Sequence, residues 1–200
     1  MAERRVNSMG GGRNDRFRPK ADIRITLLET AVGCMTESAR IAERRLGVLQ
    51  PAIEILDSHR TMAVSTLRSD GWPQTTIVGY ANDGWTVYFL IFRMSQKFAN
   101  IERDNRISIA ISSDANYLSD IKAVYAGAHA SEVTDERERA LAWALLSKRH
   151  PNLGDFGFPD QADAALMRAA CKYVSILDYS QGIGHTEALI VGDNGSAAKG

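Results

Sequence analysis

The 200-residue sequence lacks three features: a set of cysteines, an excess of one charge and a long apolar run. It has only two cysteines, Cys34 and Cys171, which are too few for the disulfide framework of a small secreted protein and favour a reducing compartment. Its 24 basic and 24 acidic residues cancel, so no overall basic field attracts nucleic acid. The longest strongly apolar run, residues 87–92, is far too short to cross a membrane. These absences predict a cytoplasmic protein without a nucleic-acid or membrane partner.

The rest of the composition predicts a globular protein with a polar segment at each end. The 44% apolar content fits a folded domain, which we expect over residues 21–191. Residues 1–20 contain six basic and two acidic side chains, three consecutive glycines and almost no large apolar residues. This pattern predicts a disordered basic tail, and the small and polar residues of 192–200 predict a second disordered tail.

Short β-type runs separated by turn signals follow one another from residue 62 onward. Asp70-Gly71 and Asp83-Gly84 lie between such runs, and Asp-Gly is a strong hairpin signal because glycine supplies the positive φ of a tight turn. In a later run, Ile107, Ile109 and Ile111 alternate with small or polar residues, as in a strand with one buried face. Strands are therefore expected at residues 62–67, 75–80, 86–92, 107–112, 123–132 and 173–178.

Helical patterns flank and interrupt these strands. Apolar residues recur at helical spacing over residues 36–56, where Pro51 is expected to divide the segment into two helices. A helix is predicted from an N-cap at Asp135 to the stop at His150-Pro151, and a second short helix at residues 161–170. Hairpin-linked strands with helices at the rim predict a mainly β fold, a six-stranded antiparallel barrel with flanking helices.

The segment between the third and fourth strands has the most suggestive chemistry. Ser95 occupies an N-cap position before a short helix, whose N-terminus offers unpaired N–H groups and a positive dipole end. Gln96 and Lys97 add an amide and a cation to the same turn, and Arg93 precedes it. These residues fit an anion site, and they equally fit an N-capped surface turn with one solvated lysine.

The order of these features resembles the FMN-binding split barrel of the pyridoxamine 5′-phosphate oxidase-like family. The resemblance lies in a series: a strand, an Asp-Gly turn, Gly-x-Pro at Gly71 to Pro73, two further strands around a second Asp-Gly turn, then Ser-x-Lys and a helix. It is close over residues 56–133 and looser elsewhere. No single triplet is diagnostic, and the ordered spacing carries the resemblance.

The resemblance implies FMN as cofactor, bound at the two-fold interface of a homodimer. It implies that the phosphate is held by Ser95, Gln96 and Lys97. Thr76 stands where many relatives have an arginine that reaches the phosphate, so Arg93 is the candidate to compensate, and Leu90 replaces a threonine. The residues implied to line the flavin ring are Gln74, Thr75, Thr76, Ile77, Val78 and Gly79, with Lys122 reaching the flavin from the partner subunit.

The implied activity is FMN-dependent oxidation or reduction of a small organic substrate, with NAD(P)H as a candidate donor. Tyr179 and His185, in a Gly-containing loop after the last expected strand, are candidates for groups near the substrate, although the loop also fits a C-terminal turn with an exposed histidine. The arginine-rich C-terminal signature of the oxidase proper is absent, so pyridoxamine phosphate is not the expected substrate.

The histidines are scattered without metal-ligand spacing, so no metal site is expected. Alternatives are a flavin-storing module without turnover, or the same barrel binding haem or a deazaflavin.

Overall fold

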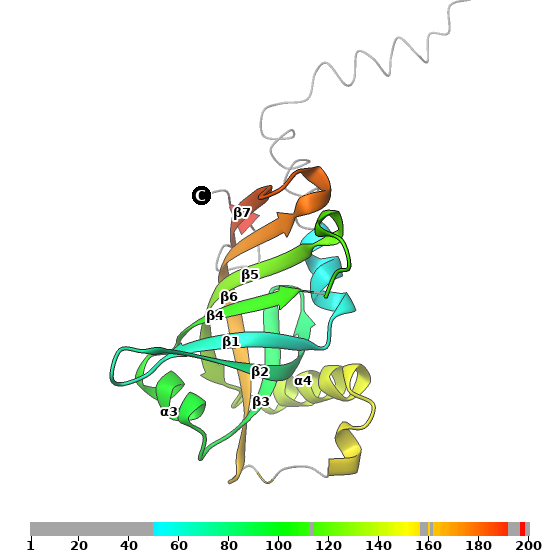
Figure 1. Ribbon diagram of the computed structural model, residues 1–200. Coiled ribbons are helices and arrows are strands. Elements are labelled where there is room, and N and C mark those ends of the chain that lie inside the picture. Colours follow the sequence, from blue (N-terminus) through cyan, green and yellow to red (C-terminus); the bar gives the residue numbers. More distant parts are fainter. Residues whose placement is uncertain (1–49, 113, 157–159, 161, 192–196, 199–200) are drawn as a thin grey trace, which may run out of the picture. The chain divides into compact units, whose positions relative to one another are not determined.

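The computed structural model describes residues 50–112, 114–156, 160, 162–191 and 197–198 (Figure 1). The predicted basic tail at residues 1–20 and most of the helical pattern at 36–56 lie outside these residues, as does most of the predicted tail at 192–200. Of the helical pattern, residues 50–58 are described and are helical. The predicted division of the pattern at Pro51 depends on residues outside the described ones.

The strands form one antiparallel sheet that closes into a barrel. Its order is β3-β2-β1-β4-β5-β6-β7-β8, and β3 also pairs with β6, which joins the first six strands in a ring. The predicted mainly β, six-stranded antiparallel barrel is therefore confirmed. The strands are β1 (Thr61–Leu67), β2 (Pro73–Asp83), β3 (Thr86–Phe92), β4 (Arg106–Ser112), β5 (Lys122–Glu132), β6 (Ala164–Asp178), β7 (Thr186–Val191) and β8 (Ala197–Ala198).

Two helices beside the barrel begin at side-chain caps that the sequence indicates. Ser95 caps α3 (Gln96–Arg103) and Asp135 caps α4 (Glu136–Arg149), which confirms both predicted N-termini. Figure 1 shows the two helices on separate sides of the strands β1, β2 and β3. Single turns of 3-10 helix complete the described structure: η1 (Leu118–Asp120), η2 (Leu153–Phe156) and η3 (Tyr179–Gln181).

The predicted helix at residues 161–170 is wrong, because Ala164 to Ala170 form the first half of β6. Alanine, leucine and methionine favour helices in isolation. Here the segment lies between β3 and β5, and pairs with both of them. Ala165, Met167 and Ala169 are buried in the barrel core. Pairing on both edges and burial therefore outweigh the local preference.

The sheet extends one hairpin beyond the last expected strand. Residues 178–186, expected after the last strand, instead connect β6 to β7, which pairs with Tyr173 to Leu177 of β6. Gly182 and Gly184 adopt positive φ angles of 135° and 80° in this connection, which glycine does without steric cost. The apolar run at residues 188–191 was the overlooked strand signal.

The barrel encloses one apolar core, and α4 covers a second. Phe98 and Ile101 of α3 join the core of the barrel, as their spacing predicts, and so do the three alternating isoleucines of β4. Ala142 and Leu146 of α4 pack with a separate cluster that includes Tyr88 of β3. No helix among the residues described is long and apolar enough to span a bilayer.

Asn100 fixes α3 against the barrel. Its side chain is 1% exposed, and its Nδ2 donates to Thr66 Oγ1 of β1 at 3.0 Å and to Gln74 Oε1 of β2 at 3.1 Å. Its Oδ1 accepts a hydrogen bond from Gln96 Nε2 at 3.0 Å. One amide therefore joins the start of α3 to two neighbouring strands.

We predict that Asn100→Ala lowers the free energy of unfolding by about 1–3 kcal/mol, because Thr66 and Gln74 lose their buried donor. Urea denaturation monitored by far-UV circular dichroism measures the change. The control is Glu102→Ala on the exposed side of the same helix, which should stay within about 0.5 kcal/mol of the parent. Equal losses in both variants would contradict this role of Asn100.

Candidate functional site

The start of α3 presents main-chain donors with no acceptor in the described structure. Ser95 Oγ accepts from the N–H of Phe98 at 3.2 Å, and the Ser95 carbonyl accepts from Phe98 and Ala99. The N–H groups of Gln96 and Lys97 have no acceptor among the residues that the structure describes. Two free donors at the positive end of a helix favour an anion.

Lys97 adds a positive charge to this turn. Its side chain is half-buried, and burial lowers the pKa of its ammonium group. Within the described part of the chain, the ammonium forms no ion pair. A half-buried cation without a counter-charge gains more from a bound anion than a fully solvated lysine does.

Arg93, expected to compensate for the missing arginine at Thr76, is held by Glu132. Its guanidinium makes a two-point ion pair with that carboxylate, with Nη1 3.0 Å from Oε2, and lies 5.3 Å from the centre of the Phe98 ring. The hydrogen bonds to Glu132 raise the pKa of Arg93. The structure therefore places Arg93 next to the turn with its charge balanced by Glu132, which leaves Lys97 as the cation of this turn without a described counter-charge.

Among the described strands, the first half of β2 is paired along one edge only, so its other edge is open. Residues 73–79 pair with β1, whereas β3 pairs only with residues 80–83. The N–H of Tyr80 donates toward the β1 side, to the Arg60 carbonyl at 3.1 Å. Because antiparallel residues alternate in direction, the main-chain groups of Thr75, Ile77 and Gly79 point toward the open edge. This edge can hydrogen-bond a planar ligand.

The side chains of this segment alternate between two environments. Val78 is buried in the barrel core, and Gln74 is held by Asn100, which joins the predicted ring-binding strand to the predicted phosphate-binding helix. Thr75 Oγ1 lies 2.7 Å from Ser65 Oγ on the outer face. Thr76 Oγ1 is buried and has no hydrogen-bond partner in the described structure. An unpaired buried hydroxyl is costly unless something else bonds to it.

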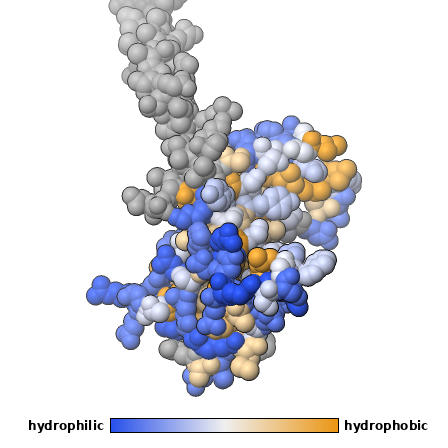
Figure 2. All heavy atoms as spheres, turned by 90° about the vertical axis from the view of Figure 1, so that its left-hand side faces the viewer, coloured by the Kyte–Doolittle hydropathy of each residue, from blue (hydrophilic) through white to orange (hydrophobic). Residues whose placement is uncertain are grey.

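The start of α3 lies on a polar side of the molecule. Figure 2 faces the side on which Figure 1 places α3, and hydrophilic atoms cover most of it. Hydrophobic atoms gather at its upper right, at the height of β7 in Figure 1. The candidate anion site is thus among polar groups, away from that apolar patch.

Three other predicted site residues gather around the hairpin that joins β6 to β7. Lys122 Nζ lies 3.3 Å from Asp178 Oδ2, the N–H of Tyr179 donates to the carbonyl of Ile121 at 3.0 Å, and His185 Nε2 lies 3.2 Å from Glu187 Oε1. Among the described residues, no hydrogen bond or ion pair joins them to α3 of the same chain. Nowhere in the described residues do three His, Cys, Asp or Glu side chains lie close enough together to hold a metal ion.

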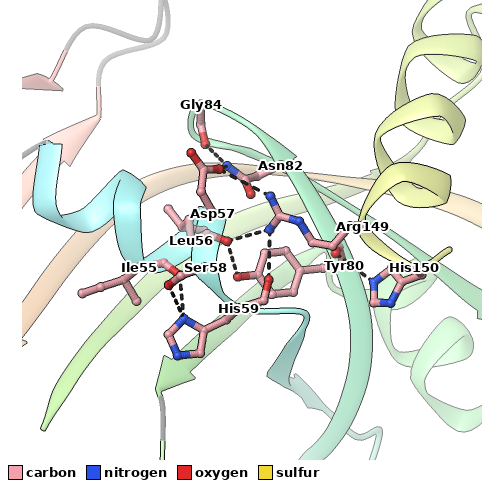
Figure 3. Close-up of polar contacts among 10 residues, drawn as sticks. All are labelled: Ile55, Leu56, Asp57, Ser58, His59, Tyr80, Asn82, Gly84, Arg149 and His150. Atoms are coloured by element: carbon pink, nitrogen blue, oxygen red, sulfur yellow. Dashed lines mark hydrogen bonds and ion pairs between the residues drawn. The ribbon is translucent and has the colours of Figure 1, made fainter.

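The sequence analysis missed a cluster built from three separated segments (Figure 3). Arg149 at the end of α4 donates to the carbonyls of Leu56 and His59 at 2.6 and 3.1 Å. His150 Nε2 lies 3.1 Å from the carbonyl oxygen of Tyr80. A Cβ at Gly79 would lie 3.1 Å from His150 Cε1, so glycine lets the imidazole approach β2. No local signal links these residues, since the fold alone brings them together.

We predict opposite effects for two threonines on neighbouring strands, the buried Thr66 and the half-buried Thr76. Thr76→Val removes a hydroxyl that has no described partner, so the free energy of unfolding should stay level or rise by about 1 kcal/mol. Thr66→Val removes an acceptor of Asn100 and should lower it by about 1 kcal/mol. Urea denaturation of the ligand-free protein compares the two, and a clear loss of stability in Thr76→Val would show that its hydroxyl is already bonded.

Comparisons with known proteins give a family and a fold. Residues 50–177 match the sequence profile of the family described as Pyridoxamine 5′-phosphate oxidase. No curated protein matches the chain.

Three solved structures illustrate the likeness in fold. A haem-binding protein from Mycobacterium smegmatis is 21% identical with a TM-score of 0.59, over 70% of this chain and 57% of that one. An FAD-binding protein from Mesorhizobium loti is 20% identical with a TM-score of 0.52, over 64% and 91% of the two chains. The haem storage protein HutZ from Vibrio cholerae is 23% identical with a TM-score of 0.53, over 62% and 89%.

At these identities the three structures show the fold alone, and this chain spans little more than half the length of the Mycobacterium smegmatis protein. The sequence profile covers most of the chain and includes both the Ser-x-Lys turn and β2. The chain therefore belongs to the pyridoxamine 5′-phosphate oxidase-like split-barrel family, as its ordered motifs indicate.

Proposed function

We propose that this protein is a homodimeric flavoprotein that binds FMN and exchanges electrons with a small organic substrate. The observation that carries the proposal is the turn at Ser95 to Lys97, where two N–H donors have no described acceptor and a half-buried ammonium has no described counter-charge. A phosphate dianion needs donors and positive charge at one point, and this turn supplies both.

The second part of the proposal concerns the flavin ring. The open edge of β2 offers the main-chain groups of Thr75, Ile77 and Gly79 to a planar ligand with its own donors and acceptors. Thr76 adds a hydroxyl that has no described partner. When bound, FMN supplies the electron transfer, and these residues hold and orient it. NAD(P)H is the electron donor that we propose to test first.

The outer face of the barrel supports a homodimer. Ile77, Ala63, Ala110 and Tyr125 lie side by side on four successive strands, with Ile77 69% and Tyr125 43% exposed. Small and apolar side chains in one row suit the flat interface of two sheets. In such a dimer, Lys122, Tyr179 and His185 would be available to the flavin site of the partner.

A cytoplasmic location is also proposed, from the scarcity of cysteine. Of the two cysteines, Cys171 lies in the described residues and is a free thiol in the barrel core. Burial raises its pKa to about 12, so it stays protonated and unreactive. A buried, inert thiol fits a reducing compartment without requiring one.

We predict that Lys97→Gln weakens FMN binding by about 10- to 100-fold, because a charge-assisted contact to phosphate contributes about 1.5–3 kcal/mol. Riboflavin lacks the phosphate, so its affinity should change by less than about twofold. Quenching of flavin fluorescence on titration measures both affinities.

The matched control is Arg137→Gln, which removes one exposed positive charge from α4. It should leave both affinities unchanged. If Lys97→Gln lowered the affinity for riboflavin as much as the affinity for FMN, the lysine would not be the phosphate contact. If the parent protein bound neither flavin at micromolar concentration, the proposed function would fail.

The affinity for FMN should fall in alkaline solution. Bound phosphate favours the protonated form of Lys97, so binding weakens as the pH rises through the pKa of that residue. Because burial lowers this pKa, the decline should begin at a lower pH than for a solvated lysine. Above pH 7 the phosphate stays fully ionised, since its second pKa is about 6.

Titrations of FMN and riboflavin across this pH range separate the lysine from the ionisation of the ring. The affinity for FMN divided by the affinity for riboflavin should fall as the pH rises in the parent protein. In Lys97→Arg this ratio should stay constant, because arginine keeps its positive charge. A ratio that does not change with pH in the parent would exclude Lys97 as the titrating group.

Haem is the second candidate ligand, supported by the haem-binding and haem-storing neighbours that share the fold. The absorption spectrum of the purified protein distinguishes a Soret band from the two-band spectrum of a flavin, and mass spectrometry distinguishes FMN from a deazaflavin. A flavin-storing module is recognised by a bound flavin that NAD(P)H does not reduce and that no substrate reoxidises.

A further inference from the structure

We propose that a cavity between helix 50–58, β2 and α4 binds a small phosphorylated sugar, at a site separate from the proposed flavin site. The cavity has a volume of about 520 Å³, within the range of about 300–1,000 Å³ typical of ligand sites. Its walls include Asp57, Arg60, Asn82, Lys148 and Arg149, and Figure 3 shows Asp57, Asn82 and Arg149 converging from the three elements.

The charge of the walls favours an anion. Three of the lining residues, Arg60, Lys148 and Arg149, are cations, and Asp57 is the one acidic residue among the described lining residues. The side chains of Arg60 and Lys148 form no hydrogen bond or ion pair with any described residue. A local excess of positive charge around a concave surface attracts anions even though the whole chain has no net charge.

Arg149 is held in place before any ligand arrives. It donates to the Leu56 and His59 carbonyls, and its guanidinium lies 3.4 Å from Asp57 Oδ1 and 5.3 Å from the centre of the Tyr80 ring. A fixed guanidinium loses little conformational entropy on binding a phosphate. The more exposed Arg60 and Lys148 can then close on the same group.

Asn82 has an unpaired acceptor, which favours a ligand that carries a hydrogen-bond donor. Its side chain is 6% exposed, and its Nδ2 donates to Asp57 Oδ1 at 3.0 Å and to the Gly84 carbonyl at 3.4 Å. Both partners are acceptors, so the orientation of the amide is fixed. Its Oδ1 is buried without a hydrogen-bond partner in the described structure. A ligand hydroxyl would relieve the cost of this unpaired oxygen.

These two requirements together define the ligand class. A phosphate alone satisfies the cations, and a neutral polyol alone satisfies Asn82. A phosphorylated sugar carries both groups within one small molecule. The cavity uses the second half of β2 and α4, whereas the proposed flavin site uses the first half of β2 and α3, and Figure 1 shows the two helices apart.

The test is a calorimetric titration of the full-length protein with ribose 5-phosphate, with inorganic phosphate and ribose as comparison ligands. We expect saturable binding of one ribose 5-phosphate per chain, tighter than either comparison ligand. We expect the same affinity in Lys97→Gln as in the parent, which makes the result independent of the proposed flavin site.

The deciding variant is Lys148→Gln, with Arg137→Gln as the control on the same helix. Lys148→Gln should weaken the binding of ribose 5-phosphate by about two- to fivefold, as expected for one solvent-exposed ionic contact, while Arg137→Gln should leave this affinity unchanged. Both positions are on the surface, so neither change threatens folding.

Four results would overturn the proposal: no saturable heat with ribose 5-phosphate, equal affinity in Lys148→Gln and the parent, loss of ribose 5-phosphate binding in Lys97→Gln, or inorganic phosphate binding as tightly as the sugar phosphate. The last result would remove Asn82 from the site and leave only an anion-binding surface.

Discussion

The fold depends on the pairing of β6 along both of its edges. On one edge residues 167–178 pair with β5, and on the other edge the first half of β6 pairs with β3 and the second half with β7. The change of partner coincides with a bulge, where Gly127 and Ala128 of β5 face Tyr173 and Cys171, so that Lys172 is an extra residue. A bulge bends and twists a strand. This one lets a single strand close the barrel with one half and extend the sheet with the other.

The closure also creates the open edge at which we place the flavin. All of β3 pairs with β6, but β3 pairs with β2 only over Tyr80 to Asp83. Among the described strands, residues 73–79 of β2 are therefore paired on one side alone, and Asn100 fixes α3 to Gln74 at the start of this segment and to Thr66 of β1. The donors of α3 and the main chain of β2 come together because the barrel is closed at β6 and incomplete between β2 and β3.

The features that could be predicted from the sequence are local ones. The caps at Ser95 and Asp135, the Asp-Gly turns and the alternating isoleucines of β4 each depend on a few adjacent residues. The first half of β6 was missed because its alanines favour a helix until two strands pair with them. The pair of Arg93 with Glu132 and the meeting of Asp57, Asn82 and Arg149 join distant segments, and only the folded topology determines such contacts.

The open edge of β2 has a consequence for association as well. Unpaired peptide groups on a strand are a template for a strand of another molecule, and proteins usually shorten, cover or interrupt such edges. Pro73, which lacks an N–H group, begins this one, and β3 covers its far end from Tyr80 onward. Between Pro73 and Tyr80 the main-chain N–H and C=O groups on this edge remain available for hydrogen bonds. A ligand or subunit bound there therefore also protects the protein from edge-to-edge aggregation.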